Sequence, residues 1–309
     1  MKFPPYLSAG DHVAILSPAG KIARQVAERG ADALRRQGFV VAIGQHAFDE
    51  AGVFAGSDAA RAADMQQALD DHSIRAIFFA RGGYGCLRTH LLLDWTTFFK
   101  HPKWLVGFSD ATVFHAFLTR HAIASVHGVM TGGFEQDEVS SEGFLRLLDL
   151  LEGRMPEYEI PAHTLNRTGV ASGILAGGNL SIIQSLRGTP LDIEPQGKIL
   201  FIEDIGEHHY HLDRMMHNLK AGGVLEQLTG LIVGHFTGMK DGETPFGMCA
   251  CEIIREAVAA YHYPVVFGFP AGHDVPNLPL LTGAPIAVRV AESGVTIKPM
   301  SGEATTTGC

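Results

Sequence analysis

The sequence has no run of basic residues and no apolar stretch long enough to cross a membrane. Lys and Arg number 24 against 33 Asp and Glu, which gives a formal charge of −9. A nucleic-acid-binding surface needs clustered cations that displace counterions, and a membrane-spanning helix needs about 18 or more consecutive apolar residues. We therefore expect neither nucleic acid nor a membrane as a partner.

Cysteine is scarce, and its four positions do not form a disulfide framework. They are Cys86, Cys249, Cys251 and Cys309, and the C-x-C pair is too close for an ordinary disulfide and has no second pair to complete a zinc site. The first residues contain two prolines and Asp11, which is unlike a secretory signal peptide. Free thiols in the cytoplasm are the expectation.

Charged residues make up only 18% of the chain and hydrophobic residues 46%, so 309 residues can bury a sizeable core in one large or two ordinary domains. In the first half, short β-branched runs alternate with amphipathic segments. This alternation predicts parallel βαβ units whose ligands bind at the carboxyl ends of the strands. The expected strands are 12–17, 39–43, 74–80 and 104–108, and the expected helices are 22–37, 57–71, 111–120 and 142–151.

The second half repeats this mixture and ends in a hairpin. Strands are expected at 198–203, 228–235 and 264–268, helices at 180–186, 208–220 and 249–261, and the hairpin at 286–290 and 295–299. Between the halves, Pro156 and Pro161 lie in a segment without periodicity. We therefore predict an amino-terminal domain at 1–152, a linker at 153–168 and a carboxy-terminal domain at 169–309.

Ser109 lies between an expected strand and an expected helix, in the segment Gly107-Phe-Ser-Asp110. This is the arrangement of a nucleophile elbow, in which a tight strand-to-helix turn presents the hydroxyl and the helix amino end offers N–H groups to an oxyanion. The alternative is that Ser109 or Asp110 simply caps the helix.

The segment Arg81-Gly82-Gly83-Tyr84-Gly85 also follows a strand, so it is expected at the same edge of the sheet. Its glycines allow the backbone to approach a ligand closely and to present N–H donors. The segment lacks the G-x-G-x-x-G spacing and a Walker lysine, so dinucleotide or ATP binding is poorly supported. A purely structural turn remains the alternative.

A serine nucleophile needs a base, and the base needs a carboxylate that fixes its tautomer. Glu203 and Asp204 end one apolar strand of the second half, and His273 follows another. Ser109, Glu203 and His273 could form such a set, although each alone could equally be a hydrogen-bonded structural residue.

The richest histidine segment contains His208, His209, His211 and His217. On a helix, His209 and His217 would lie about 12 Å apart, whereas zinc–ligand bonds are about 2 Å long. Three ligands of this helix therefore cannot converge on one ion, and we expect no metal.

Several of these segments together resemble the LD-carboxypeptidase family of serine peptidases. They occur in the family's order and cover nearly the whole chain. The matching stretches are Phe54-Ala-Gly-Ser-Asp58 with Arg61 and Asp64, Arg81–Gly85, Gly107–Asp110, His127-Gly128, Gly177-Gly-Asn-Leu180, Arg187-Gly-Thr-Pro190, Ile202-Glu-Asp204, Tyr210 with Asp213-Arg214, and Gly272-His-Asp274 with Pro276-Asn277. The chain departs from the family at Val129 and at Leu281-Thr282.

The resemblance implies an α/β protein with a flavodoxin-like parallel-sheet domain followed by a smaller β-rich α/β domain. It implies a Ser109–Glu203–His273 triad across the two domains, without metal or cofactor, in a cytoplasmic homodimer. The implied reaction of cell-wall recycling releases the terminal D-alanine of murein tetrapeptide. The oxyanion donors would be the backbone N–H groups of Gly83 and Asp110, and the candidate substrate-binding residues are Arg81, Gly82 and Asn179.

Three other functions stay open. A second branch of the family hydrolyses peptide–nucleotide antibiotics of the microcin C type and stacks an aromatic side chain of the second domain on the nucleotide. The only tryptophans here, Trp95 and Trp104, lie in the first half, which favours the carboxypeptidase branch. A non-catalytic α/β ligand-binding protein would not need Ser109, Glu203 and His273 to converge, so their convergence distinguishes the two classes. An amidotransferase-like enzyme is weaker still, because the elbow has no cysteine.

Overall fold

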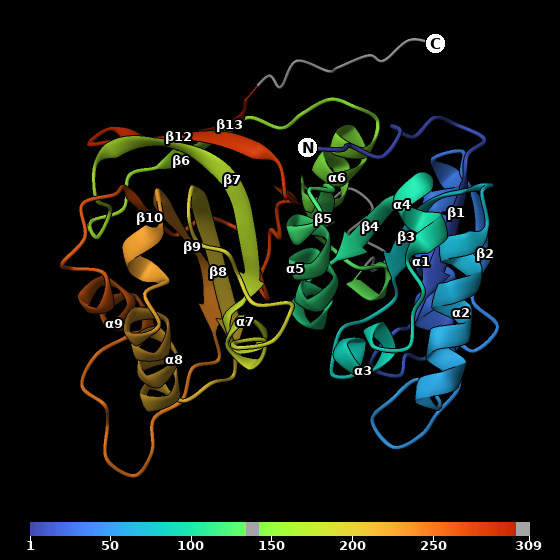
Figure 1. Ribbon diagram of the computed structural model, residues 1–309, viewed down its shortest axis with the longest axis horizontal. Helices are drawn as coiled ribbons and strands as arrows, with labels where there is room; N and C mark the ends of the chain where they lie inside the picture. Colours follow the sequence, from blue (N-terminus) through green and yellow to red (C-terminus); the bar gives the residue numbers. More distant parts are fainter. Residues whose placement is uncertain (134–141, 301–309) are drawn as a thin grey trace.

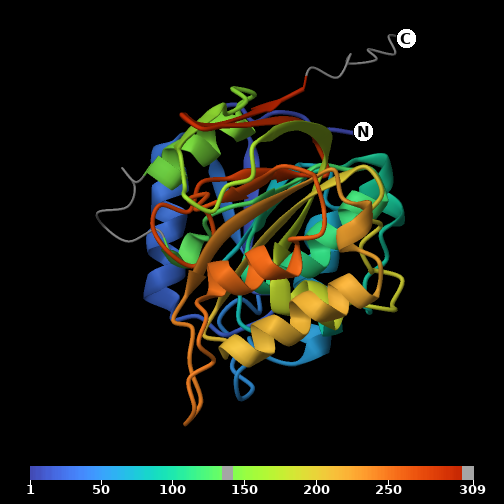
Figure 2. The ribbon, with the colours of Figure 1, turned by 90° about the vertical axis from the view of Figure 1, so that its left-hand side faces the viewer.

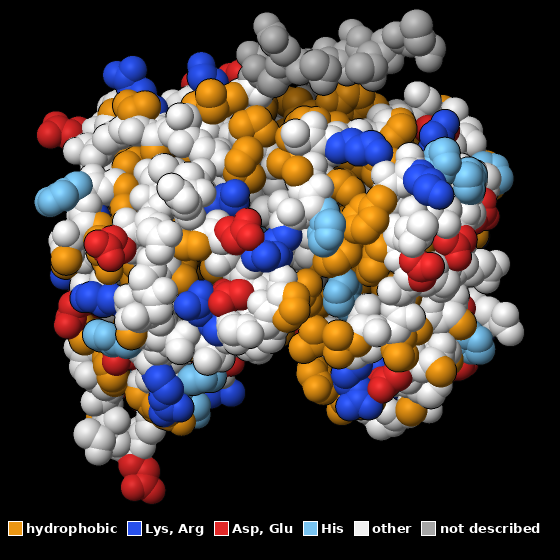
Figure 3. Space-filling view, viewed as in Figure 1, with side chains coloured by type: hydrophobic (Ala, Val, Ile, Leu, Met, Phe, Trp, Pro, Cys, Tyr) orange, Lys and Arg blue, Asp and Glu red, His pale blue; other side chains and the backbone are white. Residues whose placement is uncertain are grey.

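Two β-sheets organise the chain, and each forms the centre of one lobe (Figure 1). The computed structural model describes residues 1–133 and 142–300. The first lobe contains most of the amino-terminal half, and the second lobe most of the carboxy-terminal half. Between them the surface is hollowed on its lower side in the view of Figure 3.

The first sheet has the order β11-β5-β4-β3-β1-β2. Five of its strands are parallel in the 2-1-3-4-5 order of flavodoxin-like folds, which confirms the predicted fold class. The parallel strands are β1 (His12–Leu16), β2 (Val40–Ile43), β3 (Ile74–Phe79), β4 (Trp104–Gly107) and β5 (Ser125–His127).

Helices cover both faces of this sheet because its strands carry apolar side chains on both sides. In β1, Val13 and Ile15 pack into one apolar core, and Ala14 and Leu16 into another. At the start of α2, the Ser57 hydroxyl accepts a hydrogen bond from the Ala60 N–H and so caps the helix. The helices are α1 (Arg24–Arg36), α2 (Asp58–Asp70), α3 (Cys86–His90), α4 (Thr96–Lys100), α5 (Thr112–Arg120) and α6 (Glu142–Leu151), with 3₁₀ turns η1 (Ser109–Ala111) and η2 (Thr131–Gly133).

The edge strand β11 (Leu280–Thr282) comes from the carboxy-terminal half of the chain. It pairs antiparallel with β5, and the Thr282 and Ser125 hydroxyls lie 2.8 Å apart. A strand from the second half of the chain thus completes the sheet of the first lobe, and the sequence did not predict this pairing. The domain boundaries given above stay predictions.

The second sheet has the order β10-β9-β8-β7-β12-β13-β6, with four parallel strands followed by antiparallel ones. Strand β6 falls within 153–168, so the expected linker contains an edge strand of this sheet. The strands are β6 (Tyr158–Pro161), β7 (Gly169–Asn179), β8 (Lys198–Ile205), β9 (Gly230–Thr237), β10 (Val265–Phe267), β12 (Pro285–Ala291) and β13 (Gly294–Pro299).

The helices that accompany the second sheet are α7 (Leu180–Ser185), α8 (His209–Ala221) and α9 (Ala250–Ala257), with a 3₁₀ turn η4 (Leu225–Gln227). Helices α8 and α9 lie side by side against one face of the sheet (Figure 2). In residues 1–133 and 142–300, every helix is too short or too polar to span a bilayer.

Candidate active site

Ser109 occupies a strained turn between β4 and α5. Its φ is +63°, a left-handed conformation that non-glycine residues rarely adopt. Helix α5 has no side-chain cap, and the Asp110 carboxylate instead accepts a hydrogen bond from the Cys86 N–H at 2.7 Å. Burial raises the pKa of Asp110 above its ordinary value. The turn therefore has the geometry of a nucleophile elbow and not that of a simple helix cap.

The Ser109 hydroxyl contacts an imidazole from the other lobe, and this imidazole contacts a carboxylate of the same lobe. His273 Nε2 lies 3.0 Å from Ser109 Oγ, and His273 Nδ1 lies 2.6 Å from Glu203 Oε2. Glu203 is completely buried at the carboxyl end of β8. With the Nδ1–H group donating a hydrogen bond to the Glu203 carboxylate, Nε2 has its lone pair free to accept the serine proton. This convergence distinguishes a hydrolase from a non-catalytic binding protein.

The glycine-rich loop after β3 lies directly against Ser109, at the sheet edge predicted for it. A Cβ atom at Gly82 would be only 3.0 Å from Ser109 Cβ and 3.2 Å from Oγ. The Gly20 N–H donates to the Gly82 carbonyl at 3.0 Å, and Gly83 has a φ of +97° that favours glycine. The loop therefore brings backbone close to the hydroxyl. The assignment of Gly83 and Asp110 as oxyanion donors stays a prediction.

His273 is held in place by neighbours that the sequence argument did not single out as functional. The Asn277 side chain accepts a hydrogen bond from the Gly272 N–H at 3.0 Å. The Phe108 ring packs edge-on against His273, with 4.8 Å between ring centroids, and also against His127 at 5.9 Å. His127 is completely buried, which lowers its pKa well below the ordinary value. The only signal for Asn277 was its place in the family resemblance.

Asp204, the neighbour of Glu203, does not contact His273. It accepts hydrogen bonds from Asn179 Nδ2 and the Ser181 N–H, both at 2.9 Å, and burial raises its pKa to about 6. Asn179 also caps α7 by accepting from the Ile182 N–H at 3.2 Å. These contacts tie the amino end of α7 to β8.

Arg81 donates to the Lys21 carbonyl at 3.0 Å. The substrate-binding role expected for Arg81, Gly82 and Asn179 stays a prediction.

The three histidines within α8 each have a carboxylate partner of their own. His209 pairs with Asp241 at 2.8 Å, His211 with Glu207, and His217 with Asp213 at 3.6 Å. Within residues 1–133 and 142–300, no group of three His, Cys, Asp or Glu side chains is arranged to hold a metal ion.

Comparison with known proteins identifies the relatives of this chain. Residues 13–128 match the LD-carboxypeptidase N-terminal domain, and residues 172–288 match the LD-carboxypeptidase C-terminal domain. A Bacillus subtilis (strain 168) protein named "Probable murein peptide carboxypeptidase" is 30% identical, over 96% of this chain and 94% of that protein.

Two solved structures extend the comparison. The muramoyltetrapeptide carboxypeptidase from Oxalobacter formigenes aligns with a TM-score of 0.86 and 26% identity, covering 94% of this chain and 99% of that one. The microcin C7 self-immunity protein aligns with a TM-score of 0.84, covering 96% and 98%, but its 20% identity shows the shared fold alone. The two matched domains and the full-length relative lead to one conclusion: this chain belongs to the LD-carboxypeptidase family of serine peptidases.

Proposed function

We propose that this protein hydrolyses the LD-peptide bond of murein tetrapeptide and releases its terminal D-alanine, with Ser109 as nucleophile, His273 as base and Glu203 as the group that orients the base. One observation carries the proposal: the hydroxyl, imidazole and carboxylate form a continuous chain of contacts of 3.0 and 2.6 Å. The names of the relatives support the substrate.

In the first half of the reaction, Ser109 Oγ attacks the scissile carbonyl carbon while His273 Nε2 takes the hydroxyl proton. The carbonyl oxygen becomes an oxyanion, for which the backbone N–H groups of Gly83 and Asp110 are the proposed donors. The C–N bond then breaks, and His273 gives its proton to the amine of the departing D-alanine. An ester between Ser109 and the shortened peptide remains.

In the second half, water attacks this ester and gives a proton to His273. The C–O bond to Ser109 breaks, the proton returns to Ser109 Oγ, and the shortened peptide leaves with a free carboxylate. Glu203 accepts the hydrogen bond of His273 Nδ1–H and stabilises the imidazolium that forms in each half. The products are one tripeptide stem and one D-alanine per water consumed.

The test is the release of D-alanine from purified murein tetrapeptide, measured with a coupled D-amino-acid oxidase assay. We expect Ser109→Ala to fold normally and to lower kcat by about 10⁴-fold or more, as loss of a triad serine does elsewhere. Ser185→Ala is the matched control, because this exposed hydroxyl donates to the Ile182 carbonyl one turn earlier and to no other group in residues 1–133 and 142–300. Turnover by Ser109→Ala within tenfold of the wild type would refute the assignment of the nucleophile.

We further propose that the enzyme works as a cytoplasmic homodimer, as the family resemblance implies. Sedimentation velocity of the purified protein tests the assembly, and a monomer at micromolar concentration would contradict it. Fractionation of the cells that make the protein tests the compartment.

A further inference from the structure

The Asp110 carboxylate connects the nucleophile elbow to the glycine-rich loop. Asp110 follows Ser109 in the turn, is buried, and accepts a hydrogen bond from the Cys86 N–H at 2.7 Å. Cys86 is the first residue of α3, which begins where the loop 81–85 ends. Gly85 precedes this helix and has no side chain that could cap it, so a carboxylate from another segment accepts the hydrogen bond instead.

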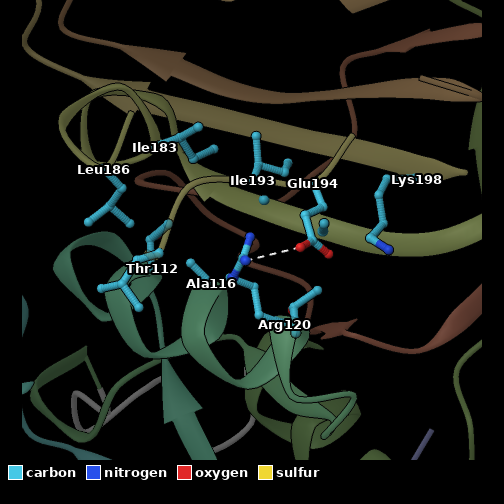
Figure 4. Close-up of a pocket in the computed structure, with 12 residues that line it drawn as sticks. Thr112, Ala116, Arg120, Ile183, Leu186, Ile193, Glu194 and Lys198 are labelled. Carbon is cyan, nitrogen blue, oxygen red and sulfur yellow. Dashed lines mark ion pairs between the residues drawn. The ribbon is translucent and has the colours of Figure 1, made fainter. Parts of the chain in front are cut away.

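The side chains of Asp110 and Thr112 are directed to different lobes. Thr112 lies at the seam between the lobes, where it lines a pocket together with Ala116 and Arg120 of the same helix (Figure 4). Asp110 instead bonds to Cys86 within the first lobe. The Asp110 side chain therefore supports the elbow from the side of the glycine-rich loop, separately from the contact between the lobes.

The glycine-rich loop is held at both ends, with Gly83 between the two points. At its start, the Gly82 carbonyl accepts a hydrogen bond from the Gly20 N–H at 3.0 Å, and at its end Cys86 bonds to Asp110. Between these points Gly83 has a φ of +97°, and glycine loses more conformational freedom on folding than any other residue. A glycine-rich segment needs such fixed points if its N–H groups are to keep one direction.

The surroundings of the Asp110 carboxylate include hydrogen-bond donors and a cation, which compensate the burial of its charge. Burial raises the pKa of Asp110, whereas the hydrogen bonds from Cys86 and Gly85 and the charge of Arg61 act in the opposite direction. Arg61 is itself buried and donates to the Gly56 carbonyl at 2.6 Å. These neighbours favour a group that only accepts hydrogen bonds. The amide of an asparagine would turn its NH₂ group, itself a donor, toward one of them.

We propose that Asp110 is a positioning residue, whose carboxylate fixes the direction of the Gly83 N–H relative to the N–H of Asp110 itself. This inference rests on the proposed function, in which these two groups are the oxyanion donors. Such donors must lie about 2.7–3.1 Å from the developing oxyanion, and an error of about 1 Å can cost about 100-fold in rate. Substitution of the side chain leaves the N–H of residue 110 in place, so a loss of rate reports the position of the donors and not their number.

The experiment compares Asp110→Asn with the wild-type enzyme in two reactions. In D-alanine release from murein tetrapeptide, we expect kcat to fall by about tenfold to 100-fold and KM to change by less than about threefold, because the donors act in the transition state. The second reaction is inactivation by diisopropyl fluorophosphate, followed by intact-protein mass spectrometry. Here Ser109 Oγ bonds to phosphorus, fluoride leaves, the hydroxyl proton goes to His273, and the phosphoryl oxygen occupies the oxyanion hole. The second-order rate constant should also fall by about tenfold to 100-fold.

Asp64→Asn is the matched control for the loss of a buried carboxylate. Asp64 lies in α2 and accepts a hydrogen bond from the His46 N–H at 2.8 Å, and burial raises its pKa as well. Both variants should lose thermal stability, but only Asp110→Asn should react more slowly. Asp110→Ala introduces no unpaired donor, so it replaces the asparagine variant if that variant does not fold, and it should be slowed at least as much.

Three results would overturn the inference: the Asp110 variants react with the fluorophosphate at the wild-type rate, Asp64→Asn is slowed equally, or the wild type is not modified at Ser109. A wild type that is modified at Ser109 but releases no D-alanine would instead contradict the proposed substrate. In that case the comparison of the inactivation rates would still decide the role of Asp110.

Discussion

Substitution of Gly272 tests whether the contact between His273 and Glu203 is needed for catalysis. Gly272 has a φ of +124° and precedes His273. A Cβ atom built on it would lie 2.8 Å from Glu203 Oε2, 2.9 Å from Glu203 Cβ and 3.1 Å from Glu203 Cγ. Glu203 is completely buried. The added methyl group would therefore collide with the stem of a fixed side chain and could not simply displace a flexible tip.

The displacement can be worked out from these distances. Ordinary contacts of Cβ atoms begin near 3.4 Å, so Gly272→Ala must move the two segments apart by about 0.6 Å. Errors of about 1 Å in the position of a catalytic group can cost about 100-fold in rate. We expect kcat for D-alanine release to fall by about 10-fold to 100-fold. The left-handed backbone should also cost about 1–2 kcal/mol of stability.

Gly188→Ala is the matched control for the backbone effect. Gly188 also has a positive φ, +75°, but a Cβ atom there would meet no heavy atom within 4 Å. Both variants should lose stability in thermal unfolding, and only Gly272→Ala should lose kcat. If the two variants had equal kcat values, the contact between the His273 segment and Glu203 would not limit the reaction, and our reasoning about the triad would be refuted.

Three further predictions concern the metal, the substrate and the pH. Exhaustive EDTA treatment should leave D-alanine release unchanged, because a serine mechanism with backbone oxyanion donors needs no Lewis acid; loss of activity that zinc restores would overturn that mechanism. A tetrapeptide ending in L-alanine should be cleaved at least about 100-fold more slowly than one ending in D-alanine, because its carboxylate would be misplaced against the Ser109 elbow, and equal rates would contradict the LD specificity. Burial raises the pKa of Asp204 to about 6, whereas an Asp in the unfolded chain titrates at about 4. Between these two pH values the folded state binds more protons than the unfolded chain. The free energy of unfolding should therefore fall by up to about 3 kcal/mol as the pH rises from 4 to 7. Asp204→Asn should remove this fall in urea unfolding, and an unchanged slope would show that Asp204 is not its source.

The sequence predicted the longer elements because their apolar residues follow a clear period, but it missed elements that exist only through pairing. Strand β7 (Gly169–Asn179) contains four glycines and looks like a loop. The structure explains two of them: a Cβ atom at Gly177 would lie 1.9 Å from the Phe201 carbonyl oxygen, and one at Gly173 would lie 2.6 Å from the Gly197 carbonyl oxygen. These glycines let β7 approach β8 closely. The three-residue strands β5 and β11 are too short to carry a period of their own.

The residue types of the candidate site could be read from the strand pattern, whereas the choice of Glu203 over Asp204 as the partner of His273 came from the family resemblance. Glu203 and Asp204 are adjacent acids at the end of the same strand, and side chains alternate between the two faces of a strand. Phe201 packs into the core that contains Phe269 and Ala271, next to the His273 segment, whereas Ile202 packs against α8. Glu203 therefore faces His273, and Asp204 faces α7. Alternation predicts that the Glu203 and Asp204 side chains point to opposite faces of the sheet. The packing of the second lobe determines which of the two carboxylates contacts His273.

The distance between Ser109 and His273 depends on contacts that lie on two sides of the triad. On one side, Gly178 has a φ of +144° and leaves room for Thr112, whose hydroxyl accepts a hydrogen bond from the Asn179 N–H at 3.0 Å. Thr112 begins the helix that follows the elbow, so this bond connects the elbow of the first lobe to the end of β7 in the second. On the other side, β11 joins the first sheet a few residues after His273. Because both connections are made by backbone or by a β-branched side chain with few rotamers, the two lobes hold the serine and the histidine at a fixed separation without needing a ligand to bring them together.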